Sequence, residues 1–298
     1  MNTRITQSMT TRLVLADIQN ASERLTKTQQ KIASGKELTA PSDDPYRASR
    51  ALQLRSELAE HQQYTRNVTE ARSWQNVTDT ALDAINKYVL RARDLVVRAS
   101  SGTLGQEDRN AIAKEIEQLA AAVKAEGNVQ YAGRYVFAGT RTDTAPYSEA
   151  DDLFHGTPSP SEVRREIGPG VQVAVNVVGN DVIGDGTSGI LGALRQIATD
   201  LAAGNTGALG TTDLQALDNA HSALVDQRAV VGALSNRLEA AAGRLGELEE
   251  ATTKLLSETE DADMAKTLVD FSMQQSVYQA ALQAGARLLQ PSLLDFLQ

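Results

Sequence analysis

The sequence predicts a mainly α-helical protein: a long antiparallel helical bundle or coiled coil built from both chain ends, with a small β-containing insertion in the middle. Apolar residues in the last third recur at alternating steps of three and four, which is the pattern of one narrow stripe along a helix. The seven prolines stand at positions 41, 45, 146, 158, 160, 169 and 291 and leave two long proline-free stretches. Because proline breaks helix interiors, those stretches have room for long helices.

The longest apolar stripe begins near Leu214. Its members are Leu217, Ala220, Leu224, Gln227, Val231, Leu234, Leu238, Ala241, Leu245, Leu248, Thr252 and Leu255. At 1.5 Å per residue, a helix from Leu214 to Leu255 would be about 60 Å long. A helix of that length needs a partner of equal length, which the sequence has to supply.

The N-terminal part of the chain supplies matching helices. A first helix is expected over residues 10–34, with Gly35 just past its end. An interruption follows, and Asp44 as N-cap with Pro45 at the first helical position starts a second helix that runs to about residue 99. A turn at 100–105 leads to a third helix that ends at Gly127.

The middle of the chain has a different pattern. Residues 135–137 and 171–177 are rich in β-forming side chains, and the second run alternates as a strand does. Four prolines and many glycines punctuate the space between them. We therefore expect residues 139–186 to form a small β-rich insertion, followed by a helix over 187–203.

The C-terminal stripe breaks phase near residues 257–263 and then resumes. We expect three regions: terminal helical segments (1–44 plus 258–298) that order on assembly, a core of long helices (45–138 plus 187–257), and the insertion (139–186). The interruptions on the two sides, Lys36 to Asp44 and Ser257 to Asp263, should lie close together if the chain ends pair side by side.

Composition excludes several classes of protein. The net charge of −9 argues against nucleic acid as a partner, because phosphate binding needs clustered Lys and Arg. No apolar run approaches the roughly 18 residues of a membrane span, so no membrane insertion is expected. The N-terminus lacks the apolar region of a secretory signal peptide. With no cysteine, disulfides and thiolate chemistry are excluded.

A search for catalytic or metal-binding patterns is negative. The histidines at 61, 155 and 221 lie far apart, without metal-ligand spacing. Asn, Asp and Gly near residues 179–186 fit tight turns better than a calcium loop, which would need a Glu at its twelfth position. Asp43 and Asp44 fit a helix start better than a catalytic pair. We therefore expect neither an enzyme nor a cofactor.

The terminal stripes are more informative. They include polar or glycine positions, and an apolar tail follows Pro291 with nothing after it to cover it, which is typical of an interaction surface. The residues expected at this surface are Val14, Ile18, Leu25, Ile32, Met264, Leu268, Phe271, Tyr278, Leu282, Leu289, Leu293, Leu294 and Phe296.

Several separated motifs carry a resemblance to a known family. Ile32-Ala33-Ser34-Gly35-Lys36-Glu37-Leu38 with a following Asp-Asp resembles the N-terminal region of the bacterial flagellins, and residues 260–265 and 279–285 resemble their C-terminal region. The run Pro41 to Leu52 is similar to the hook-associated members, whereas filament flagellins typically carry Ala-Lys-Asp-Asp-Ala-Ala-Gly there. The signature residues at the two interruptions are Ser42, Asp43, Asp44, Pro45, Glu260, Asp261 and Asp263.

The resemblance implies a structural protein of the bacterial flagellum, exported without a cleaved signal peptide and located outside the cell. Its partners would be neighbouring copies in a ring, an adjoining hook-associated protein, flagellin, and an export chaperone bound to the C-terminal helix. A filament-forming flagellin is the nearest alternative, and a cytoplasmic coiled-coil adaptor is the alternative from another class.

Overall fold

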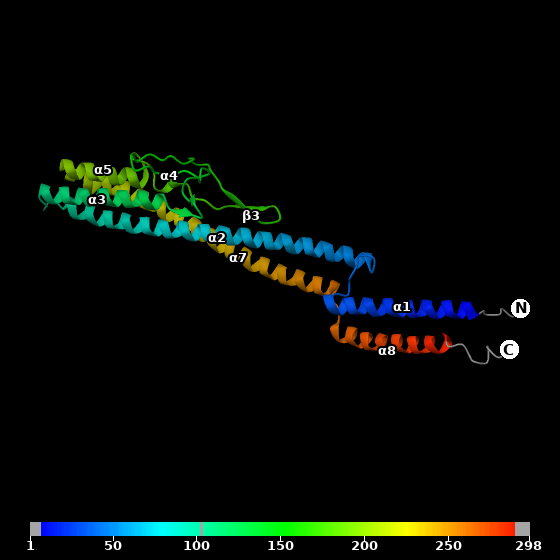
Figure 1. Cartoon of the computed structure of the whole chain (residues 1–298). Helices are drawn as coiled ribbons and strands as arrows, with labels where there is room; N and C mark the ends of the chain where they lie inside the picture. Colours follow the sequence, from blue (N-terminus) through cyan, green and yellow to red (C-terminus); the bar gives the residue numbers. More distant parts are fainter. Residues whose placement is uncertain (1–6, 102–103, 290–298) are drawn as a thin grey trace, which may run out of the picture. The chain divides into compact units, whose positions relative to one another are not determined.

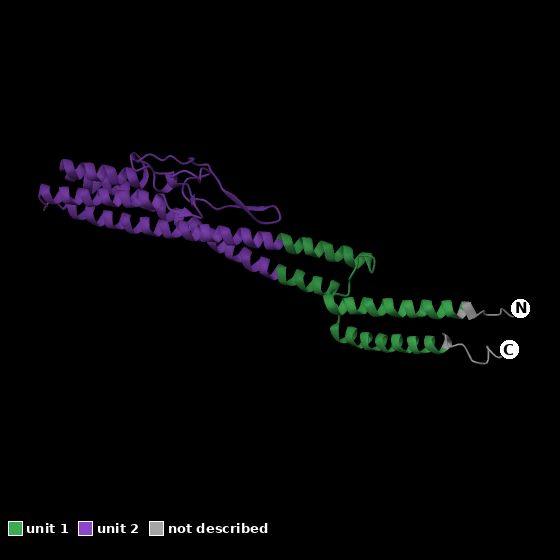
Figure 2. Ribbon diagram, in the orientation of Figure 1, with its two compact units in different colours: residues 1–60, 249–298 green, residues 61–248 purple. Residues whose placement is uncertain are grey.

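The computed structural model describes residues 7–101 and 104–289 of the chain (Figure 1). It divides into two compact units, residues 1–60 with 249–298 (unit 1) and residues 61–248 (unit 2), shown in Figure 2. The two longest helices contribute residues to both units. Helices dominate the described residues and the strands form only two small hairpins, so the predicted mainly α class is confirmed.

The elements follow one another along the chain in this order. They are α1 (Gln7–Ser34), α2 (Pro45–Ser100), α3 (Gln106–Gly127), β1 (Gln130–Tyr131), β2 (Arg134–Tyr135), β3 (Arg164–Gly168), β4 (Val171–Ala174), α4 (Gly179–Val182), α5 (Gly189–Ala203), α6 (Thr206–Ala208), the π-helical turn η1 (Leu209–Asp213), α7 (Leu214–Glu260) and α8 (Met264–Leu289).

The core of unit 2 lies between α2, α3, α5 and α7. Apolar side chains from all four helices form one buried cluster, including Leu82, Ile116, Ile190 and Leu224. Ion pairs cross the rim between α2 and its neighbours, for example Arg93 to Asp218 of α7 at 2.8 Å. The long proline-free stretches therefore pack against each other along their apolar stripes, as the sequence predicts.

The β-containing region is anchored to these helices. Phe137 and Tyr147 are fully buried in the same cluster as the helices. Strands β3 and β4 form an antiparallel hairpin whose Val173 packs with α2 and α7 in a second cluster. The Gln75 side chain donates a hydrogen bond to the Val175 carbonyl at 2.6 Å, which fastens the end of this hairpin to α2.

The strands are shorter than the sequence predicts. Only Tyr135 of the run 135–137 belongs to a strand, because Val136 and Phe137 turn into the core instead. Strand β4 ends at Ala174, although Val175 and Val177 remain buried. The alternation of apolar side chains therefore predicts which residues of this region are buried better than it predicts which residues pair as strands.

Candidate assembly interface

In unit 1, α1 and α8 lie side by side and antiparallel (Figure 1). The sequence-predicted residues Val14, Ile18, Leu25 and Ile32 of α1 are half-buried, and so are Phe271 and Tyr278 of α8. These members of the terminal stripes therefore lie along the contact between the two helices.

Two contacts fix the spacing of this helix pair. Near the middle, the buried Thr28 hydroxyl donates a hydrogen bond to Oε1 of Gln274 at 2.7 Å. Near the far end, Gly285 is buried against α1. A Cβ atom at this position would lie 3.1 Å from both Ile18 and Val14, so the small residue permits close approach of the helices. Thr28 and Gly285, which interrupt the apolar stripes, thus lie inside the pair.

Several apolar side chains of unit 1 remain exposed. Met264, Leu268 and Leu282, which the sequence placed at the interaction surface, have exposed fractions of 40%, 53% and 43%. Other exposed apolar side chains of these two helices are Met9, Leu13, Leu15, Val269, Met273 and Val277. Four further predicted residues fall outside what the structure describes: the side chain of Leu289, and the whole of Leu293, Leu294 and Phe296. The pair thus leaves apolar surface on both helices uncovered.

The two interruptions of the helical pattern lie against each other, as the sequence predicts. Lys36 and Asp261 form an isolated antiparallel bridge. The backbone N–H of Glu37 donates to the Glu260 carbonyl at 2.8 Å, and the N–H of Ala262 donates to the Gly35 carbonyl at 2.9 Å. The end of α1 and the start of α8 are therefore held together by main-chain hydrogen bonds.

The acidic residues of the signature act as caps. Asp44 accepts a hydrogen bond from the Arg47 N–H at the start of α2, and Asp263 accepts from the N–H groups of Ala265 and Lys266 at the start of α8. Each carboxylate therefore satisfies free donors at a helix N-terminus. The interpretation of Asp44 as a helix start is thus confirmed.

Asp43 stabilises the loop before α2. Its carboxylate accepts hydrogen bonds from the Thr39 hydroxyl and the Ala40 N–H, both at 2.9 Å. The Thr39 hydroxyl, followed by the Ala40 N–H, lowers the pKa of this exposed carboxyl. Pro45 is the first residue of α2, and Ser42 is exposed.

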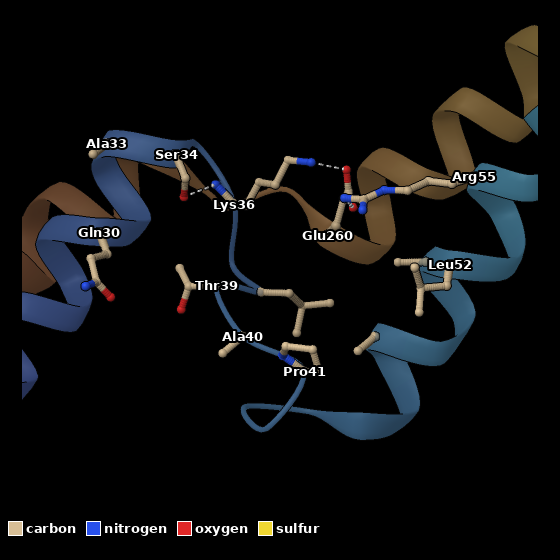
Figure 3. A pocket seen from close by; sticks show the side chains of 13 residues that line it. Gln30, Ala33, Ser34, Lys36, Thr39, Ala40, Pro41, Leu52, Arg55 and Glu260 are labelled. Carbon is tan, nitrogen blue, oxygen red and sulfur yellow. Dashed lines mark hydrogen bonds and ion pairs between the residues drawn. The ribbon is translucent and has the colours of Figure 1, made fainter. Parts of the chain in front are cut away.

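Glu260 is the one signature residue whose side chain is buried. Its carboxylate pairs with the Lys36 ammonium at 2.6 Å and with the Arg55 guanidinium of α2 (Figure 3). The family resemblance identified Glu260 as a signature position but did not identify Arg55. The sequence feature that could have indicated a cationic partner is the position of Glu260, a carboxylate in line with the buried side of α7 at the end of that helix.

An open groove adjoins this ion-pair cluster, with a volume of about 750 Å³. Apolar side chains from three segments of unit 1 line most of it, among them Leu38 and Ala51. Pro41 and Leu52 belong to the same lining (Figure 3). Such a surface suits packing against another protein better than the binding of a polar small molecule.

No metal or membrane site emerges from the described part of the chain. Within residues 7–101 and 104–289, no three His, Asp or Glu side chains gather where they could hold a metal ion. Nor does any described helix have the length and apolar character needed to cross a bilayer. Asp185 stabilises a turn, since its Oδ1 accepts hydrogen bonds from the backbone N–H and hydroxyl groups of Thr187 and Ser188.

Comparison with known proteins matches both ends of the chain. A family model described as the bacterial flagellin N-terminal helical region matches residues 2–142, and one described as the C-terminal helical region matches residues 214–297. The chain belongs to the bacterial flagellin family. It is accordingly a structural protein of the flagellum, not an enzyme, and assembles with other flagellar components.

Individual relatives include both hook-associated and filament members of the flagellin family. Flagellar hook-associated protein 3 of Escherichia coli (strain K12) is 26% identical over 294 residues, covering 90% of this chain and 91% of the relative. The flagellar filament 33 kDa core protein of Treponema phagedenis is 27% identical over 300 residues, covering 99% of each.

A solved structure shares the fold of this flagellin-family chain. Flagellar hook-associated protein 3 from Legionella pneumophila superimposes with a TM-score of 0.61 at 14% identity, covering 69% of this chain and 98% of that one.

Proposed function

We propose that this protein forms the junction between the flagellar hook and filament, and that it self-assembles as a ring through its terminal helices. The observation that carries the proposal is the apolar surface of the α1–α8 pair that a single chain leaves exposed. Val269, Met273 and Val277 of α8 are exposed by 66%, 57% and 55% and recur every fourth residue. Such a stripe on one side of a helix is suited to packing against a neighbouring copy.

Coupling of folding to assembly follows from the energetics of this pair. Ordering a residue costs about 1–2 kcal/mol of backbone entropy, and the pair buries only one narrow face of each helix. Neighbouring copies would bury the remaining apolar side chains, worth about 25 cal/mol per Å². We therefore propose that the terminal segments 1–44 and 258–298 become fully ordered only in the assembled particle.

The assignment to the junction, and not to the filament, rests on the segment that leads into α2 and forms its first two turns. Residues Pro41 to Leu52 resemble the hook-associated members, and hook-associated protein 3 is among the relatives that span nearly the whole chain. Leu52 is exposed by 63% and Tyr46 by 81%, so the family-distinguishing segment offers side chains to a partner.

A filament-forming flagellin is the second candidate, since the alignment with the Treponema phagedenis filament protein covers 99% of this chain. Deletion of the gene separates the two functions. Loss of a junction protein leaves flagellin secreted into the medium but unassembled, whereas loss of the flagellin leaves hooks without secreted flagellin. The second result would contradict the junction assignment.

The proposed partners are neighbouring copies, an adjoining hook-associated protein, flagellin, and an export chaperone that covers the C-terminal helix. The exposed stripe on α8 supports a chaperone, because it would otherwise associate before export. We also propose export to the cell exterior without a cleaved signal peptide. Recovery of the chain, with its N-terminus intact, from culture supernatant supports this proposal; retention in the cytoplasm would favour the coiled-coil adaptor.

A further inference from the structure

We infer that Glu260 is the positioning residue that holds the α1–α8 pair to the adjoining ends of α2 and α7 in unit 1. These ends are residues 45–60 of α2 and 249–260 of α7, and we call them the helix base. The inference concerns a joint inside one chain, whose residues 36–37 and 260–262 are ordered before assembly, whereas in the proposed function the helices α1 and α8 beyond it become fully ordered only in the particle. Its test therefore does not depend on assembly.

The first argument is the placement of a charge at an apolar position. The inward side of α7 in the helix base carries Thr252, Leu256 and then Glu260, whose side chain is only 8% exposed. A buried carboxylate is costly unless it is paired and hydrogen-bonded. Here two cations from different segments provide that pairing: Lys36, just after α1, and Arg55, in α2.

The second argument is that Glu260 contacts segments of unit 1 that are distant in sequence. Lys36 lies two residues beyond α1, Arg55 lies in α2, and Glu260 itself ends α7, four residues before α8 begins. The main chain of Glu260 is also engaged, because its carbonyl accepts from the Glu37 N–H. Glu260 thus contacts the connection between α1 and α2 through both its side chain and its main-chain carbonyl, and the connection between α7 and α8 begins directly after it.

A neighbouring contact supports the same joint from α2. The Arg47 guanidinium donates two hydrogen bonds to the carbonyl of Thr259, at 3.1 Å from Nε and 2.6 Å from the terminal nitrogen. This carbonyl belongs to the last turn of α7, where carbonyl groups lack partners within the helix. The Glu260 pairing therefore acts on a helix end whose position is already restricted.

The third argument is that replacing a buried ion pair by apolar side chains is often neutral for stability, so we infer that this pair serves to select one arrangement. Lys36 and Arg55 are 38% and 48% exposed at their side chains, so both can regain water if the carboxylate is removed. An apolar replacement of Glu260 would keep the burial but lose the directional pairing. The expected consequence is a loose joint in a chain of normal stability, which distinguishes positioning from a merely structural role.

The test is amide hydrogen exchange in the full-length chain carrying Glu260→Met. The probes are the N–H groups of Glu37 and Ala262, which donate across the joint. We expect at least tenfold faster exchange at both amides, with an unchanged urea midpoint for unit 2. Glu258→Met is the matched control: this exposed residue lies on the same helix end, and its replacement should leave both rates unchanged.

Reversal of the charges supplies a second measurement. The triple variant Glu260→Lys, Lys36→Glu, Arg55→Glu keeps both attractions with opposite sign and should restore protection toward that of the parent chain. Parent-like exchange in Glu260→Met would overturn the inference, as would a parent chain unprotected at both amides. If Glu260→Met fails to fold, the triple variant decides: restored protection supports the role, and its absence contradicts it.

Discussion

At the residue scale, polar side chains in buried places carry the most specific information. Thr28 joins the two terminal helices through Gln274, and Glu260 joins three segments. Asp213, at the end of η1, has a different environment: it is 4% exposed, and its Oδ2 has no hydrogen-bond partner. Burial, and then the nearby Asp200 carboxylate, raise the pKa of the Asp213 carboxyl.

This environment predicts a pH dependence. A folded-state pKa above the unfolded value means that the group stabilises the fold at low pH, and that this contribution is lost as pH rises through the folded-state pKa. Asp213→Asn removes the charge, and its amide can donate to Asp200. We expect the variant to gain about 1 kcal/mol at pH 8 and less at pH 4, measured by urea unfolding.

The control for this experiment is the exposed Asp226 on α7. Asp226→Asn should change stability by less than about 0.5 kcal/mol at either pH, as is usual for surface substitutions. A variant Asp213→Asn that is less stable than the parent at pH 8 would mean that the carboxylate is stabilising in its ionised form.

At the element scale, the sequence predicts the long helices and their apolar stripes well, because burial follows helical periodicity. On α7 the predicted stripe is buried at Leu217, Leu224, Leu238 and Leu245. Farther along, however, Leu248 and Leu255 are exposed by 38% and 47%, so their assignment to the stripe is wrong.

The physical reason for that error is the mismatch between the heptad and the helix. A straight α-helix drifts by about 20° per heptad from a strict 3.5-residue repeat, and so by about 100° between Leu217 and Leu255. The buried side therefore keeps Thr252 of the predicted stripe and then passes to Leu256 and Glu260 in place of Leu255. The β-containing region was harder to predict, since Phe137 and Tyr147 are buried through contacts between segments distant in sequence.

The displaced stripe offers a matched pair of substitutions on α7. Leu245 is 4% exposed and packs with Val68 and Ile167, so Leu245→Asp places an unpaired charge in a core. We expect it to cost about 3 kcal/mol or more, and Leu248→Asp, only three residues away, to cost less than about 1 kcal/mol. Equal losses in urea unfolding would contradict the observed boundary of the stripe.

A second element-scale prediction concerns the spacing of α1 and α8. Gly285→Leu would place a side chain where even a Cβ atom lies 3.1 Å from Val14 and Ile18, so it should separate the helices. We expect faster amide exchange along α8 and loss of assembly. Gly243→Leu on α7, where no atom lies within 4 Å of the added Cβ, should leave both properties unchanged.

At the scale of the whole molecule, the two units differ in how much they bury. Unit 2 holds both extended apolar clusters, whereas unit 1 joins a narrow helix pair to the helix base. Limited trypsin digestion of the free chain should therefore cut α1 at Arg24 or Lys27 and α8 at Lys266 or Arg287. The sequence predicts a stable fragment of about residues 45–257, and the Glu260 joint moves its boundaries outward, toward Lys36 on the N-terminal side and Lys266 on the C-terminal side.

Resistance of both terminal helices to trypsin at low protein concentration would contradict coupled folding and assembly. In that case the α1–α8 pair would be an ordinary folded part of the monomer. The control is the same digestion after assembly, in which neighbouring copies should protect these sites.

The central claim, that copies assemble through the exposed face of the terminal helices, is tested most directly by sedimentation of purified chains. Replacement of Val269, Met273 and Val277 by Ser removes apolar side chains from the α8 stripe without touching Thr28 or the Glu260 joint. We expect the parent chain to form large particles, the triple variant to remain monomeric with the far-UV spectrum of the unassembled parent chain, and the exposed control Leu153→Ser in unit 2 to assemble as the parent does. Particles of parent size and yield from the triple variant would contradict the claim.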